Sequence, residues 1–224
     1  MSTPPTAATL AATELIDSEH PAVLAFAFVN SPGSNDRERA VALYDAVRDG
    51  FRYDMYRIDM SPASMKASSV LALGHGWCVT KAALLAASCR AIGIPARLGY
   101  ADVRNHLSTE RIRQTLKTDL FIWHGYTDIW LDGAWRKATP AFNNSLCERF
   151  GLQPLEWNGV DDSIYHAYDR AGNRHMEYVH QRGSFDDMPL AQMTADFATT
   201  YPKLEGGEDL RQADFLADVE RENP

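Results

Sequence analysis

Cysteine is scarce in this chain of 224 residues, which contains only three. An odd number of cysteines is a poor disulfide framework. On one continuous helix Cys78 and Cys89 would be separated by about 16 Å of rise, which is beyond disulfide reach. The N-terminal residues lack the positive region of a secretory signal, and the apolar run 22–29 is too short to cross a bilayer. These absences predict a reducing, cytoplasmic location.

Basic residues are also under-represented, with 22 Lys and Arg against 30 Asp and Glu and a formal net charge of -8. Nucleic-acid backbones and anionic membranes attract basic surfaces, so neither is expected as the main partner. The sequence has no internal repeat, no glycine-rich phosphate loop and no Asp-x-Asp-x-Asp-Gly calcium loop. A hydrophobic fraction of 45% and a charged fraction of 23% are ordinary for a soluble globular protein.

The length of the chain favours one domain with peripheral extensions. We expect a single domain over residues 1–224 with its core at about 35–185. A helical extension at 8–30 would precede this core, and a helix with an acidic tail at 186–224 would follow it.

Hydrophobic periodicity and capping residues predict the elements of this domain. Helices are expected at 13–20, 22–29, 37–48, 66–71, 77–92, 186–197 and 210–219. Strands are expected at 96–103, 121–130, 134–138 and 176–180, with Asp132-Gly133 as the turn between the second and third. The helix at 77–92 is apolar on several faces and should be buried against a mostly antiparallel sheet. The segment 51–58 should form a wall of the approach to the start of that helix.

Cys78 opens this buried helix in the sequence Gly76-Trp77-Cys78-Val79-Thr80. The positive end of the helix dipole and the unpaired amides of the first turn favour a thiolate, which is the nucleophilic form of cysteine. We therefore expect a pKa below that of a free thiol and the highest thiol reactivity in the chain. The alternative for Cys78 is a small apolar core residue, which is how we interpret Cys89 and Cys147.

His124 lies in the expected strand 121–130, and the order of a helical cysteine followed by a strand histidine is common among cysteine enzymes. Three blocks carry a more specific resemblance: the helix-opening Gly-x-Cys at Cys78, the segment Arg90-Ala91-x-Gly93-Ile94-Pro95-Ala96-Arg97, and His124 with Trp135-x-x-x-x-Pro140. Together they resemble the transglutaminase-like superfamily over roughly residues 40–145. The missing calcium loop favours a bacterial-type member.

This resemblance implies an α+β, papain-like fold in which the central buried helix bears the cysteine. It also implies acyl transfer from an amide of a peptide or protein, through a thioester on Cys78 and with His124 as acid and base. No cofactor is implied. Hydrolysis, deamidation and transamidation stay open, and no feature of the sequence indicates an oligomeric state.

The third member of the site departs from the family pattern, because Thr139 stands where the family has aspartate before Pro140. If Leu131 pairs with Ala134 around the turn, Thr139 lies opposite Tyr126 and diagonal to His124. Its hydroxyl is then expected to face the His124 ring and orient it. Asp128 and Asn143 are lower-ranked substitutes. A hydroxyl cannot match the charge of a carboxylate, so the alternative function is a non-catalytic relative that binds a peptide or protein in the cleft.

Donors for an oxyanion hole are expected from the Cys78 amide and from an upstream side chain, for which Trp77 and His75 are the candidates. A metal site is a further alternative in a region rich in His and Asp, at His166, His175, His180, Asp161, Asp162 and Asp169. The spacing of these residues fits no compact zinc pattern, so we expect no metal.

Overall fold

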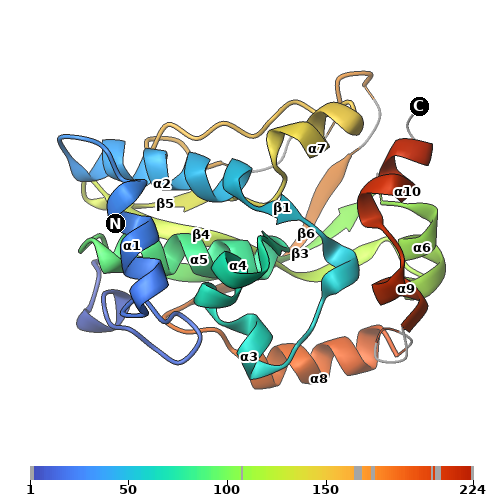
Figure 1. Cartoon of the computed structure of the whole chain (residues 1–224), viewed down its shortest axis with the longest axis horizontal. Coiled ribbons are helices and arrows are strands. Elements are labelled where there is room, and N and C mark those ends of the chain that lie inside the picture. The colour runs from blue at the N-terminus through green and yellow to red at the C-terminus, as the bar shows by residue number, and fades with distance from the viewer. Residues whose placement is uncertain are drawn as a thin grey trace.

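The computed structural model describes residues 3–106, 108–163, 168–172, 175–202, 204 and 208–222. Its main sheet has four antiparallel strands in the order β5-β4-β3-β6 (Figure 1). These strands are β3 (Ala96–Asn105), β4 (Leu120–Leu131), β5 (Ala134–Ala138) and β6 (Met176–Phe185). A short parallel pair joins β1 (Arg52–Tyr53) to β2 (His75–Gly76).

Helices cover the sheet and its ends. The helices before the central one are η1 (Ala7–Thr9), α1 (Pro21–Val29), α2 (Asp36–Gly50), η2 (Met55–Arg57), α3 (Pro62–Met65) and α4 (Ala67–Leu73). The central helix and those after it are α5 (Cys78–Ala91), α6 (Glu110–Leu116), α7 (Asn144–Arg149), α8 (Leu190–Thr200), α9 (Glu208–Gln212) and α10 (Phe215–Glu222). No helix in these described parts of the chain is long and apolar enough to span a membrane.

Helix α5 forms the centre of the molecule, between the sheet on one side and α1, α2 and α4 on the other (Figure 1). Every residue of α5 except Ala91 is buried, as its run of small and aliphatic residues requires. Gly93 follows the helix at a φ of +83°, a left-handed conformation that ends the helix at little cost to glycine. The predicted α+β architecture, a mostly antiparallel sheet on a buried central helix, is confirmed.

The hairpin between β4 and β5 has the predicted register. Leu131 pairs with Ala134, and the turn residues Asp132 and Gly133 both have positive φ values, of 50° and 81°. Two-residue hairpin loops require this geometry because it matches the twist of the flanking strands. The chain leaves β5 after Ala138, directly before Thr139.

A β-bulge interrupts β4 next to His124. Ala101 of β3 pairs with His124 and Val103 pairs with Phe121, so two steps along β3 correspond to three along β4. The bulged segment of β4 includes Trp123, whose φ of +59° is unusual for a residue with a bulky side chain. The bulge therefore sets the direction in which the His124 side chain points from β4.

Helix α8 holds this bulge in place through a buried polar network. The Trp123 amide donates to Asp102 at 3.1 Å, and the Trp123 indole donates to Asp196 of α8 at 2.9 Å. Arg182 bridges the same two carboxylates at 2.5 and 2.6 Å and stacks over the indole ring. Contacts with Asp102, Asp196 and Arg182 thus stabilise the strained backbone at Trp123.

Several predicted elements differ from the structure. Residues 13–20 are not helical, because the Thr13 hydroxyl accepts from the Ile16 amide and donates to Asp187, which fixes a turn. The predicted helix at 210–219 is divided into α9 and α10, since the Asp214 carboxylate accepts from the Leu216 amide and caps a new helix. Helices α6 and α7 were not predicted.

Candidate active site

Cys78 is the first residue of α5 and is 6% exposed. Trp77, the N-cap residue, has an extended backbone, and its amide donates to the Thr80 hydroxyl at 3.1 Å. Burial raises the pKa of the Cys78 thiol to about 11, while the backbone amides of Gly125, Val79 and Cys78 itself act in the opposite direction. The resting side chain is therefore a thiol, and the expected pKa below that of a free cysteine is wrong.

His124 is 5% exposed on β4, immediately after the bulge. Burial, and to a smaller extent the charge of His175, lower the pKa of His124 to about 4. The Tyr178 ring packs edge-on at 6.4 Å from the imidazole centroid. His124 is accordingly neutral at physiological pH, and a neutral imidazole can accept a proton.

The contact between β4 and the first turn of α5 brings these two residues to one place. A Cβ atom added to Gly125 would lie 2.9 Å from the Val79 Cα and 3.1 Å from the Cys78 carbonyl oxygen. The absence of a side chain at Gly125 thus allows the β4 backbone to pack directly on α5. Cys78 and His124 both line the same cavity.

Trp77 and His75, the expected cleft residues, differ in the cavities that they line. Trp77 lines the cavity that holds Cys78 and His124, and it also lines a neighbouring polar cavity. His75 lines only this second cavity, together with Asp54 and Arg57. Burial lowers the pKa of His75, and the nearby Asp54 carboxylate opposes this shift.

Thr139 is buried and lines neither cavity. Its hydroxyl donates to the Ser163 carbonyl at 2.8 Å, and its own carbonyl accepts from the Tyr44 hydroxyl at 3.2 Å. Since a hydroxyl has a single proton, Thr139 can act toward an imidazole only as an acceptor.

The lower-ranked orienters, Asp128 and Asn143, both have other partners. The Asp128 carboxylate accepts from Arg97 at 3.2 Å and from the Ser184 hydroxyl at 2.5 Å. The Asn143 side-chain oxygen accepts from the Tyr53 amide at 3.1 Å. These contacts explain the burial of Asp128 and the close approach of the 139–143 loop to β1.

The expected approach wall is present, since Tyr53, Met55 and Ile58 line the cavity of Cys78. Sequence reasoning missed Tyr201 in the cavity wall, and it considered His175 only as a candidate metal ligand, whereas the charge of His175 acts on the pKa of His124. Tyr201 accepts from the Ile122 amide and donates to the Leu120 carbonyl, both at 2.8 Å, which covers the free edge of β4 near the bulge. These residues lie far from the motif blocks, and no spacing in the sequence marks them.

A buried lysine supports the base of the site one turn after Cys78. Lys81 is fully buried and donates to the carbonyl oxygens of Arg48, Phe51 and Ala141 at 2.8, 2.7 and 2.8 Å. Burial lowers the pKa of Lys81 to about 7. The three carbonyls oppose this effect, since they bind all three protons of an ammonium group. Lys81 thereby joins α5 to the end of α2 and to the loop after Thr139.

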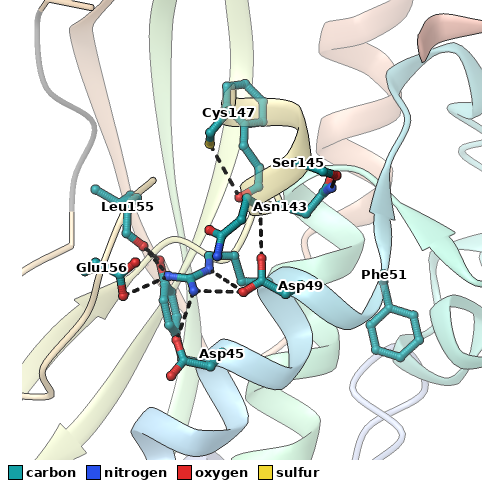
Figure 2. A network of polar contacts seen from close by, with 12 residues as sticks. Asp45, Asp49, Phe51, Asn143, Ser145, Cys147, Leu155 and Glu156 are labelled. Atoms are coloured by element: carbon teal, nitrogen blue, oxygen red, sulfur yellow. Dashed lines mark hydrogen bonds and ion pairs between the residues drawn. The ribbon is translucent and has the colours of Figure 1, made fainter. Parts of the chain in front are cut away.

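Arg48 extends this network to the surface of the molecule. Its guanidinium group forms ion pairs with Asp45, Asp49 and Glu156 at 3.4, 2.8 and 3.2 Å, and it donates to the Leu155 carbonyl at 2.9 Å (Figure 2). Figure 2 shows Glu156 and Asp49 on opposite sides of this network, Asp45 below it and Asn143 above it. The arginine is fully paired, so this cluster is a structural support.

Within the described residues, no group of three or more His, Cys, Asp or Glu side chains is placed to hold a metal ion. His166, one of the residues considered for a metal site, lies outside the described residues. The three cysteines are free and buried.

The model of the transglutaminase-like superfamily matches residues 25–140, which is more than half of the chain. Comparison with curated proteins finds no match. Among solved structures, a putative cysteine protease from Cytophaga hutchinsonii is similar, with 17% sequence identity and a TM-score of 0.45. The similarity covers 59% of this chain and 40% of that protein.

Proposed function

Because the chain belongs to the transglutaminase-like superfamily, we propose that it is a cysteine enzyme that transfers the acyl group of an amide through a thioester on Cys78. The observation that carries the proposal is the cavity shared by Cys78, at the start of a buried helix, and His124. Hydrolysis, deamidation and transamidation all begin with this acyl-enzyme and differ in the amide cleaved and in the final acceptor.

The protonation states suggest how the reaction starts. A thiol with a pKa of about 11 and an imidazole with a pKa of about 4 are both neutral at pH 7. His124 therefore acts first as a general base, taking the thiol proton as the sulfur attacks the carbonyl carbon. The resulting imidazolium gives that proton to the departing nitrogen. Water or an amine then attacks the thioester and releases the acyl group.

The oxyanion that forms during the attack needs hydrogen-bond donors. The Cys78 amide at the helix start is the main-chain candidate, and Trp77 is the side chain of the cavity wall that precedes it. His75 lies behind Trp77 in the polar cavity, which makes it the weaker candidate.

Thr139 remains our candidate for orienting His124, in the role of the family aspartate. Because the Thr139 hydroxyl donates its hydrogen bond to the Ser163 carbonyl, its oxygen would accept a hydrogen bond from the imidazole N–H of His124. Thr139→Val should lower turnover about fivefold, the equivalent of one hydrogen bond of about 1 kcal/mol. Thr139→Ser, which keeps the hydroxyl, should retain most of the activity. Equal turnover and equal pH profiles in Thr139→Val and the wild type would remove Thr139 from the mechanism.

The proposal is tested by a screen for ammonia or amine release from glutamine, asparagine and peptide substrates. Intact-mass measurement should show the acyl group on Cys78, and Cys78→Ala should release nothing. Cys89→Ala is the matched control, because Cys89 is equally buried but does not line the cavity. Release that persists in Cys78→Ala would exclude the thioester route.

The alternative function is a non-catalytic module that binds a peptide or protein in the same cavity. Two observations favour it: the family aspartate is replaced by Thr139, and burial holds Cys78 as a thiol. Binding of a peptide to both wild type and Cys78→Ala, with no acyl-enzyme in the wild type, would support this alternative.

A further inference from the structure

The cavity at Cys78 has an apolar wall. Apart from Cys78, His124 and Asn105, the described residues that line it are all apolar or aromatic, and none carries a charge. Aliphatic side chains come from several separate elements, among them Leu116 of α6, Ile122 of β4 and Met176 of β6. This composition decides what kind of group can leave water to enter the cavity.

The hydroxyl of Tyr201, although in the wall, is already committed. It accepts from the Ile122 amide and donates to the Leu120 carbonyl. Most of the remaining wall presents carbon atoms, so a polar substrate side chain would lose more hydrogen bonds to water than the few polar atoms of the wall can replace, which costs free energy. An apolar chain would gain free energy from the same transfer.

The cavity is also small. Its volume is about 40 Å³, which holds only a few water molecules. A space of this size suits a short aliphatic group. Met55 and Met176 line it, and the flexible side chain of methionine can make room for a chain that is longer than the empty space.

From these observations we propose that the acyl group transferred at Cys78 carries a short apolar chain, which the cavity binds next to the thiol. This inference rests on the proposed function for the chemistry and on the cavity alone for the binding. The chain can belong to a residue such as norleucine or methionine in a peptide or to a short fatty acid, because both present the same methylenes.

The acylation step is the same for either source. The Cys78 sulfur forms a bond to the carbonyl carbon, the bond from that carbon to the leaving nitrogen or oxygen breaks, and the thiol proton leaves with that group through His124. Water then adds to the thioester, the carboxylic acid is released and one proton of that water passes to the Cys78 sulfur.

Binding is measured first, in Cys78→Ala, so that catalysis plays no part. The probes are N-acetyl-norleucinamide, hexanamide and N-acetyl-glutaminamide, with affinities from ligand-observed NMR. We expect the norleucine probe to bind at least tenfold more tightly than the glutamine probe, which has nearly the same length but a polar end. Equal or tighter binding of the glutamine probe would overturn the inference. The affinity of hexanamide relative to the norleucine probe distinguishes a fatty-acid source from a peptide source.

Acylation is measured next, with p-nitrophenyl esters of acetate, butanoate, hexanoate, N-acetyl-norleucine and N-acetyl-glutamine and with mass detection of the acyl group on Cys78. We expect kcat/KM to rise about fourfold for each added methylene until the cavity is full. Leu116→Ala should increase the ratio of kcat/KM for hexanoate to that for acetate, and Leu116→Phe should decrease it. The ratio within one protein does not depend on how much of that protein is folded.

Leu155→Ala is the control, because Leu155 is buried to a similar degree but does not line this cavity, and its ratio should equal that of the wild type. Acylation of Cys78 without preference for longer or apolar chains would overturn this inference and leave the proposed function standing. Tight binding of the apolar probes with no acylation of Cys78 would overturn the proposed function and leave the apolar binding preference of the cavity standing.

Discussion

At Cys78 two physical effects oppose each other, and burial is the larger. The helix dipole stabilises a charge near its end by about 0.3–1 kcal/mol, whereas a shift in the thiol pKa from 9.0 to about 11 corresponds to about 3 kcal/mol. The position of Cys78 at a helix start can be predicted from the sequence. The walls that remove water from Cys78 cannot be predicted in this way, because Tyr53, Met176 and Tyr201 come from distant parts of the chain.

The neutral pair at Cys78 and His124 predicts an unusual pH dependence. Alkylation of Cys78 by iodoacetamide should rise steadily with pH toward about 11, where the thiol ionises. The rate of amide turnover should instead fall as the pH drops through about 4, because His124 gains a proton there and ceases to be a base. His124→Gln should lower turnover and remove this dependence on pH. A plateau of alkylation between pH 6 and 8 would mean that a thiolate–imidazolium pair already exists at rest.

We predict that the substitution Tyr100→Phe stabilises the protein. It is fully buried, and its hydroxyl has no hydrogen-bond partner among the described residues. Tyr100→Phe removes an unpaired polar atom and should raise the free energy of unfolding by about 1 kcal/mol. Tyr44 is the matched control, because its hydroxyl donates to the Leu155 carbonyl at 2.6 Å. Tyr44→Phe should lower stability by about the same amount, and urea unfolding of both variants tests the pair. A loss of stability in Tyr100→Phe would show that its hydroxyl is paired.

At the scale of elements, the sequence predicts α5 and the β4–β5 hairpin well, because local signals determine both. A run of small and aliphatic residues that ends at Gly93 marks the helix, and Asp132-Gly133 fixes the turn. The bulge at Trp123 has no such signal, since its partners Asp102 and Asp196 lie on other elements. The direction of the candidate base therefore depends on tertiary contacts that single-sequence patterns do not contain.

The contact between β4 and α5 is tested by Gly125→Ala. The added methyl group would meet backbone atoms of Val79 and Cys78, which cannot move without displacing the helix start, so we expect a loss of about 1–3 kcal/mol in stability. Turnover should fall further than the folded fraction, because the distance between Cys78 and His124 changes. Gly50→Ala is the control. No atom lies within 4 Å of its added methyl, and Gly50 is helical, so that variant should be at least as stable as the wild type. Full activity in Gly125→Ala would contradict the close packing.

At the scale of the whole molecule, Lys81 connects three segments that are distant in sequence: α5, the end of α2 and the loop after β5. Such a role is hidden in the sequence, where a lysine in a helix indicates an exposed face. Only the uniformly apolar residues around it suggest that this position is buried. The register of the helix thus predicts the burial, but the three carbonyl partners depend on the complete fold.

Lys81→Met keeps most of the side-chain volume and removes all three hydrogen bonds. Because three buried carbonyls lose their donor, we expect a loss of about 3 kcal/mol or more, measured by chemical unfolding. Lys66→Met is the control, at a half-buried lysine at the start of α4, and should change stability by less than about 0.5 kcal/mol. Similar stabilities of the two variants would show that Lys81 contributes little beyond its methylenes.

The burial of Cys78 also bears on how the protein ages in air. Oxidation of cysteine to sulfenic acid and beyond requires an exposed thiolate, and this side chain is 6% exposed with a pKa of about 11. Peroxide at neutral pH would therefore meet almost no anion to attack. Under the proposed function, the Cys78 thiol would stay protonated and unreactive during storage. It would become a nucleophile only when a bound substrate lies beside His124 and the thiol proton can be transferred.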